Sequence, residues 1–247
     1  DNRAGAYVGA AGNLTATVNG TTTNAGKLEA SSELHLSSAA INNQAGAEIR
    51  AGLVDLSANT ITNRGLINGG FTLLQAGTID GGRIYGDQIS IAANQLTNRG
   101  GGATNPVIAS RGDLDLAVGV MSNQDSALLL SLGNTRVGGS LDANGQATGR
   151  AGAFINKSAE VDVFGNLTIN ADSVQNIGTS VSYESSSTEH IIEYLPVDPG
   201  HPQNGQALSA ATGHMDWRLE YDDQYRADYL PNEGPGIAAN QWLIHEY

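Results

Sequence analysis

The sequence predicts an all-β chain whose larger part is a parallel β-solenoid, and three observations predict that fold class. A short unit recurs along residues 1–178, apolar and polar residues alternate within it, and no stretch sustains the apolar spacing of a helix. Aromatic residues make up only 5% of the chain, and 32 of its 247 residues are glycine. That composition fits a narrow aliphatic core interrupted by frequent turns.

The recurring unit is an apolar-x-apolar triplet, followed five residues later by an apolar residue and seven residues later by asparagine. One copy begins at Leu34-His35-Leu36 and continues to Ile41. Five copies keep the same spacing, and they end at Asn43, Asn63, Asn98, Asn123 and Asn176. The intervals of 20, 35, 25 and 53 residues between these asparagines indicate a unit near 20 residues with inserted or degenerate copies, of which Asn156 marks a weaker one.

A unit of this size cannot bury its own apolar side chains, so it must stack on its neighbours. In a parallel solenoid each coil rises about 4.8 Å, and roughly eight or nine coils over residues 1–178 give a rod of about 40 Å. We predict that the recurrent asparagines are structural. Their amides are expected to hydrogen-bond along the axis and to tolerate a left-handed backbone at the corners.

The composition changes near residue 178, which predicts a solenoid over 1–178 and a separate C-terminal segment over 179–247. The first part has 14 acidic and 10 basic residues, and the second has 11 acidic and 2 basic ones, six of the eight tyrosines and both tryptophans. The second part fits an irregular aromatic cap over the open strand edges of the last coil, and equally the start of a receptor-binding region. The aromatic residues proposed to bind a partner are Tyr194, Trp217, Tyr221, Tyr225, Tyr229 and Trp242.

Charge and composition exclude several classes of function. A net charge of −13 disfavours binding to nucleic acid, and the lack of any 18-residue apolar run disfavours membrane insertion by this segment. The chain has no cysteine, and its C-terminal histidines lack metal-ligand spacing, so we expect no metal and no cofactor.

Two short motifs could carry a function. Arg111-Gly112-Asp113 matches the tripeptide of some integrin-binding adhesins, but a similar lead into a strand recurs at Gly86-Asp87 and, with asparagine, at Gly165-Asn166. Asp113 and Asp115 could suggest the paired carboxylates of a polysaccharide-cleaving enzyme. Since Leu114 between them must face the core, both aspartates are expected to point to solvent, where neither gains the raised pKa of a general acid. We therefore expect no catalytic residue and no enzymatic activity.

Residues 54–65 (VDLSANTITNRG) and 89–100 (ISIAANQLTNRG) resemble the repeats of filamentous haemagglutinins. The resemblance covers roughly residues 10–178. It implies a right-handed β-helix in a long filament, secreted to the cell surface of a Gram-negative bacterium through the outer-membrane transporter of two-partner secretion. Proteins with such repeats include haemagglutinin adhesins and the CdiA-like proteins of contact-dependent growth inhibition, in which a receptor-binding region follows the first repeat array.

The leading functional hypothesis is therefore a section of a CdiA-like filament that presents a toxin or a receptor-binding region to neighbouring bacteria. The second is an adhesin of the haemagglutinin type that binds host cells or surfaces. A β-helix polysaccharide-cleaving enzyme is the most remote of the three.

Overall fold

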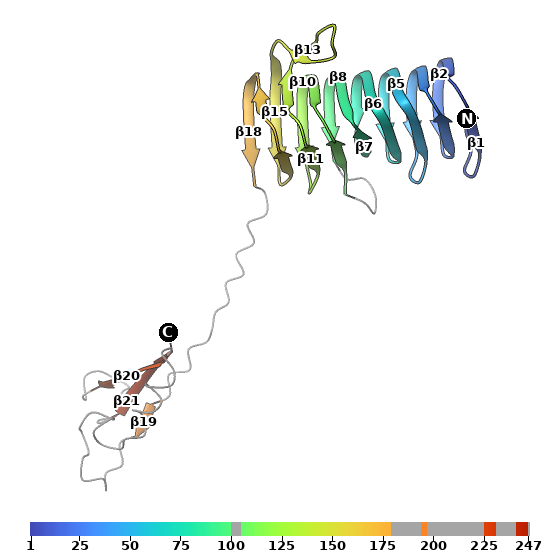
Figure 1. Cartoon of the computed structure of the whole chain (residues 1–247). Helices are drawn as coiled ribbons and strands as arrows, with labels where there is room; N and C mark the ends of the chain where they lie inside the picture. Colours follow the sequence, from blue (N-terminus) through green and yellow to red (C-terminus); the bar gives the residue numbers. More distant parts are fainter. Residues whose placement is uncertain (100–104, 179–193, 197–224, 231–240, 247) are drawn as a thin grey trace. The chain divides into compact units, whose positions relative to one another are not determined.

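The computed structural model describes residues 1–99 and 105–178 in full, together with the backbones of residues 194–196, 225–230 and 241–246. Its contacts divide the chain into two units, Asp1–Val181 and Ser182–Tyr247. Every regular element that the described residues form is a β-strand (Figure 1). The predicted all-β parallel solenoid is confirmed in the first unit, where strands stack over about eight turns.

Each turn of the solenoid contributes one short strand to a sheet that we call face 1, in which successive strands pair in parallel. The strands of face 1 are β1 (Tyr7–Ala10), β3 (Lys27–Ala30), the beginnings of β5 (Glu48–Asn63) and β6 (Leu66–Asp80), β7 (Arg83–Gly86), β9 (Val107–Ser110), β11 (Leu128–Ser131) and β16 (Glu160–Val163).

The rest of each turn forms two further parallel faces, face 2 and then face 3. The strands that supply both faces are β2 (Leu14–Asn24), β4 (Glu33–Asn43), the later parts of β5 and β6, β8 (Gln88–Asn98) and β10 (Leu114–Gln124). In the last two turns the faces are separate strands, namely β12 (Thr135–Gly138) with β15 (Ala151–Lys157), and β17 (Leu167–Ile169) with β18 (Ala171–Ile177).

The corner between faces 2 and 3 explains the spacing of the sequence unit. In β4 the pairing with β5 skips Ala39, and the inward set then changes from even to odd positions. Leu34 and Leu36 are buried before the corner, and Ile41 and Asn43 are buried after it. The apolar-x-apolar triplet is thus the inner row of face 2, and the apolar-x-Asn pair is the inner row of face 3.

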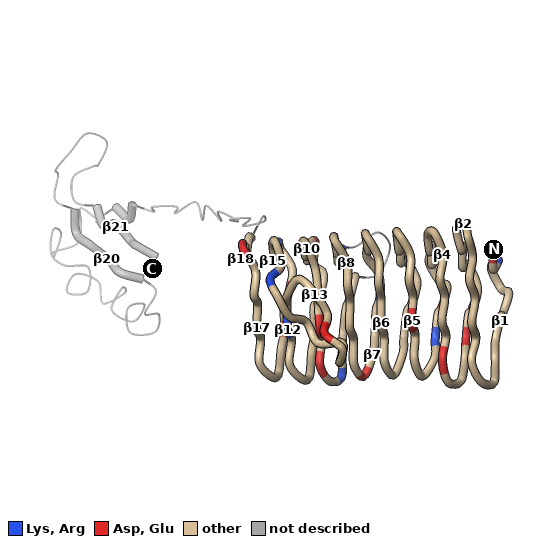
Figure 2. Tube along the Cα trace, turned by 90° about the horizontal axis from the view of Figure 1, so that it is seen from above, with Lys and Arg blue, Asp and Glu red and all other residues tan. Residues whose placement is uncertain are grey.

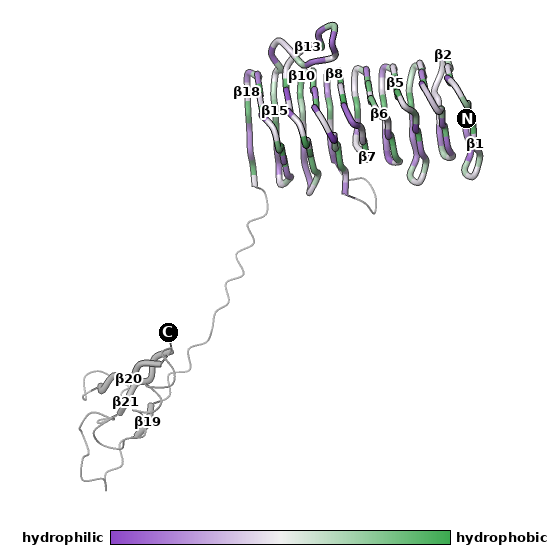
Figure 3. The backbone as a smooth tube through the Cα atoms, viewed as in Figure 1, coloured by the Kyte–Doolittle hydropathy of each residue, from purple (hydrophilic) through white to green (hydrophobic). Residues whose placement is uncertain are grey.

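The core consists of aliphatic columns that run along the solenoid, one side chain per turn in each column. Ile41, Ile61 and Ile79 form part of one such column and have no exposed surface beyond 1%. Each side chain buried in this way contributes about 1.5–3 kcal/mol relative to an exposed one. Figure 3 shows the resulting alternation of hydrophobic and hydrophilic residues along the strands.

One turn carries an ordered insertion between β12 and β15. It contains an antiparallel hairpin of β13 (Ser140–Leu141) and β14 (Ala147–Thr148), visible beside β10 in Figure 1. The hairpin lies on face 2, where Ser90 Oγ donates a hydrogen bond to the carbonyl of Gly145 at 2.8 Å.

The second unit contains a three-stranded antiparallel sheet in the order β19 (Tyr194–Pro196), β21 (Gln241–Glu246) and β20 (Tyr225–Leu230). The antiparallel pairing differs from the parallel stacking of the first unit, so the two units are built on different strand arrangements.

Candidate functional site

The recurrent asparagines of the first unit form a hydrogen-bonded column that we call the asparagine ladder. Asn24 Nδ2 donates to Asn43 Oδ1, and Asn43 Nδ2 donates to Asn63 Oδ1, both at 2.8 Å. The second amide hydrogen of each residue goes to a backbone carbonyl of the next turn, as from Asn43 to Leu66 at 3.2 Å. These side chains are fully buried, and each donates towards the C-terminal end of the solenoid. Stacking amides in this way satisfies polar groups that would otherwise be costly to bury.

The ladder has more members than the sequence indicates. Asn2 and Asn24 belong to it as well, and Asn156 links Asn123 to Asn176 with bonds of 2.9 Å on either side. The interval of 53 residues therefore contains a full ladder position. Asn24 does not match the sequence unit because Thr22 stands where the other turns have an apolar residue and because β2 has one extra residue at the corner. Asn2 does not match it because only Asp1 precedes it in the given sequence.

The interval of 35 residues contains a glycine where the other turns have asparagine. Register pairs Thr62 with Asp80 and Asp80 with Thr97, which places Gly81 between Asn63 and Asn98. Asn63 Nδ2 keeps its bond to a backbone carbonyl, that of Arg83 at 3.2 Å, but has no amide to donate to in the next turn, and the buried Oδ1 of Asn98 has no hydrogen-bond partner. The ladder is thus divided into an N-terminal and a C-terminal segment at Gly81.

The expectation of a left-handed backbone at the ladder asparagines was wrong. None of the eight ladder asparagines has a positive φ, and within residues 1–99 and 105–178 the non-glycine residues that have one are Asp125, Ser126 and Ser158. The ladder asparagines of β4, β10 and β15 lie at or next to the ends of extended strands, and the positive φ angles of those turns fall two or three residues later, at Gly46, Asp125 and Ser158. The amides therefore form hydrogen bonds within the core and do not set the backbone of the corner.

Neither charged residue of the Arg111-Gly112-Asp113 tripeptide is without a partner. The Arg111 side chain is 74% exposed and forms an ion pair with Asp87 of the preceding turn. Asp113 accepts hydrogen bonds from the backbone of Asn134 at 2.8 Å and from Arg136 at 2.8 Å. The tripeptide occupies a regular corner between β9 and β10.

Asp115 does not point to solvent, contrary to the sequence-based expectation. Its side chain is 6% exposed because the inserted hairpin covers this part of face 2. Arg136 binds both Asp115 oxygens at 2.7 and 2.9 Å, and the backbone N–H of Ala147 donates to one of them at 2.8 Å. The cluster joins the hairpin to two turns of the solenoid.

The electrostatics of this cluster oppose acid–base chemistry. The backbone N–H of Asn134 and the guanidinium of Arg136 outweigh partial burial and hold the pKa of Asp113 below its usual value. The two carboxylates raise the pKa of Arg136 above its ordinary value. A general acid needs the opposite shift, since it must keep its proton near neutral pH.

Two further ion clusters connect neighbouring turns, within a surface on which charges are sparse (Figure 2). His35 lies between Glu33 at 3.2 Å and Asp55 at 3.1 Å, and these two carboxylates raise the pKa of His35. The second cluster is Asp80, which is paired with both Arg64 and Arg99. Burial raises the pKa of Asp80, but the hydrogen bonds from Arg99 and Arg64 outweigh that effect and lower the pKa overall.

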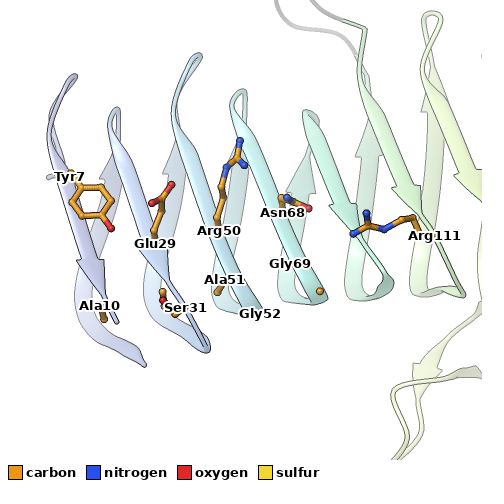
Figure 4. Close-up of a pocket in the computed structure, with 12 residues that line it drawn as sticks. Tyr7, Ala10, Glu29, Ser31, Arg50, Ala51, Gly52, Asn68, Gly69 and Arg111 are labelled. Carbon is orange, nitrogen blue, oxygen red and sulfur yellow. The ribbon is translucent and has the colours of Figure 1, made fainter. Parts of the chain in front are cut away.

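A shallow groove crosses face 1, and Figure 4 shows the side chains that line it. Glu29, Arg50 and Asn68 are direct register partners on three successive turns, and Tyr7 projects from the turn before them. Arg50 Nε is bound to Glu48 at 2.8 Å. The edge of the groove is made by small residues such as Gly52 and Gly69, so it stays open along the axis.

The predicted partner-binding residues of the C-terminal segment fall in two groups. Tyr194, Tyr225, Tyr229 and Trp242 lie on the three strands of the second unit, where the backbones of Tyr229 and Trp242 are register partners. The other two lie outside the described residues and are Trp217 and Tyr221. Binding by any of the six stays a prediction.

Within the described parts of the chain, no group of three or more histidine and acidic side chains is arranged to hold a metal ion. The same residues include no helix long and apolar enough to pass through a membrane.

Comparison with known proteins identifies one family. A family model described as "Haemagglutinin repeat" matches residues 2–100, 86–136 and 109–182, which together span most of the chain and all of the described solenoid. No curated protein and no solved structure matches the chain.

Proposed function

Since the chain belongs to the haemagglutinin-repeat family, whose members are typically secreted cell-surface filaments, we propose that it is a rigid section of such a filament, of the CdiA-like kind that presents an effector to neighbouring bacteria. The filament section holds the C-terminal segment away from the producing cell. The producing cell is a Gram-negative bacterium, and its two-partner outer-membrane transporter exports the chain.

The observation that carries this proposal is the continuity of the solenoid. Parallel pairing joins every turn from β1 to β18, the aliphatic columns run through all of them, and the asparagine ladder adds a polar column beside the core. Each turn contacts only its neighbours, so length is added without any change of design. A solenoid of this kind holds its two ends a fixed distance apart, which suits a spacer better than a catalyst.

The section is proposed to act without catalysis. The two aspartates nearest to a hydrolase pair are both bound by Arg136, and one of them lies beneath the hairpin. Neither is available to share a proton with a substrate.

Recognition is proposed for the second unit, through the aromatic strands that contain Tyr194, Tyr229 and Trp242. Tyrosine and tryptophan supply much of the binding energy of protein interfaces. The eleven acidic residues of 179–247 favour a partner with a basic surface.

The test is binding of the labelled full chain, measured by flow cytometry, to a panel of Gram-negative bacteria and to animal epithelial cells. A chain ending at residue 181 is measured beside it, with circular dichroism to verify that the solenoid is intact. Binding to bacteria that disappears with the truncation supports a receptor-binding segment in a bacterial delivery filament. Binding to animal cells alone supports the adhesin instead, and binding that survives the truncation contradicts recognition by the second unit.

A further inference from the structure

The groove on face 1 combines two aromatic rings with a row of polar side chains at one position per turn. In the outward row of this face, Gly9, Glu29, Arg50, Asn68 and Tyr85 are successive register partners. The row spans four intervals between turns, which amounts to about 19 Å at the usual strand spacing. A second hollow adjoins the first and shares Asn68 and Arg111 with it, so the groove continues past Tyr85.

The ring of Tyr7 occupies the place of the missing side chain at Gly9. A Cβ added to Gly9 would lie 2.1 Å from the Tyr7 hydroxyl and 2.5 Å from its ring carbon Cε1. The ring therefore lies across the strand with one side on the glycine, while 62% of the residue's surface remains exposed. This arrangement places one aromatic residue at each end of the polar row.

The polar groups between the rings are available to a ligand. Within the described residues, the Glu29 carboxylate, the Asn68 amide and the hydroxyls of Tyr7 and Tyr85 have no hydrogen-bond partner. The two arginines are already paired, Arg50 with Glu48 and Arg111 with Asp87. The groove thus offers hydrogen bonds and ring faces but no excess of positive charge.

The chemistry of the groove distinguishes between possible occupants. The backbone N–H and C=O groups of face 1 are used between turns, so an extended peptide cannot pair there as an added strand. A polyanion needs unpaired cations, which the row lacks. A sugar chain has hydroxyls that bond to amide and carboxylate groups, and its rings have apolar faces that pack on tyrosine.

We propose that this groove binds an extended, uncharged glycan, with its sugar rings stacked on Tyr7 and Tyr85 and its hydroxyls bonded to Glu29 and Asn68. All residues that line the site belong to the first unit. It goes beyond the proposed function, because it gives the filament section itself a ligand.

The experiment applies the purified full chain to an array of neutral, uronic-acid-containing and sulfated glycans, and then titrates the strongest neutral oligosaccharide by calorimetry. We expect retention of neutral glycans and a loss of affinity of about tenfold or more for Tyr7→Ala, the size typical of removing an aromatic anchor. Gly9→Val keeps the ring but displaces it, so it is expected to weaken binding as well. Phe164→Ala is the matched control, since Phe164 is 70% exposed and lies outside the groove.

Three outcomes overturn the proposal: no glycan is retained, only anionic glycans are retained, or Tyr7→Ala weakens binding no more than Phe164→Ala. Asn68→Ala provides a second variant that leaves both rings in place, and unchanged affinity in it contradicts the assigned polar row. None of these outcomes bears on cell binding by the second unit, which the truncated chain tests separately.

Discussion

Replacing Asn43 by alanine tests whether the asparagine ladder stabilises the solenoid. The substitution removes three hydrogen bonds: one accepted from Asn24, one donated to Asn63 and one donated to the carbonyl of Leu66. At about 1 kcal/mol net for each bond, the expected loss in the free energy of unfolding is about 3 kcal/mol. The donor of Asn24 stays buried without its acceptor, which adds to this loss, so the expected range is about 3 to 5 kcal/mol.

The matched control is Asn176→Ala at the last position of the ladder. Asn176 is exposed and accepts a single bond there, from Asn156 at 2.9 Å. Its removal is expected to change the free energy of unfolding by less than about 1 kcal/mol. Asn43→Asp adds a second comparison, because it keeps the size of the side chain but replaces two donors with acceptors, and it is expected to destabilise at least as much as alanine.

The assay is urea unfolding followed by far-ultraviolet circular dichroism, which reports on the strands of the solenoid. Both tryptophans lie in residues 179–247, so tryptophan fluorescence follows that segment independently in the same titration. Hydrogen exchange around β4 and β5 shows whether the loss is local, as expected for a repeat array whose turns contact only their neighbours. Equal effects of Asn43→Ala and Asn176→Ala would refute the reasoning, since the ladder would then contribute nothing beyond an exposed bond.

Three further predictions follow from other contacts of the solenoid. Gly82→Ala is expected to lower the free energy of unfolding by about 2 kcal/mol or more, because the backbone has φ +98° and the new Cβ would lie 2.4 Å from the amide of Asn63. Gly46→Ala, at φ +81° with open space around it, is expected to lower it by about 1 kcal/mol. A higher urea midpoint for Gly82→Ala than for Gly46→Ala would contradict this reasoning. The pKa of His35 is raised in the folded chain, so its two carboxylate contacts stabilise the fold below pH 6.5 and lose that effect as the pH rises through the folded-state pKa. Titration of the His35 ring protons by nuclear magnetic resonance measures that pKa, and a measured pKa at or below 6.5 would contradict the pairing. Arg136→Ala leaves the buried Asp115 carboxylate without its cation, and it is expected to lower the free energy of unfolding by about 3 kcal/mol and to expose the hairpin to protease. Arg150→Ala breaks only an exposed 3.5 Å pair with Asp172, and it should change neither the free energy of unfolding nor the protease sensitivity.

Local pattern determined the fold class. Alternation with period two requires strands, and an asparagine at a fixed distance after each triplet indicates a repeating turn, so the solenoid could be predicted from residues such as Leu34, Leu36 and Asn43. The family resemblance added the filament, because the repeats ending at Asn63 and Asn98 are similar along their whole length.

Register was decided only by the tertiary structure. The turns differ in length, so the positions that stack on one another cannot be read from fixed spacing, and Asn2, Asn24 and Gly81 were recognised as ladder positions only from their partners. The local sequence also does not show which residues an inserted segment will bury, since the hairpin that covers Asp115 comes from a later part of the chain. The groove on face 1 has the same origin: its row from Gly9 to Tyr85 takes one residue from each of five turns, and only stacking brings them together, because nearest neighbours in a solenoid lie about twenty residues apart in the sequence.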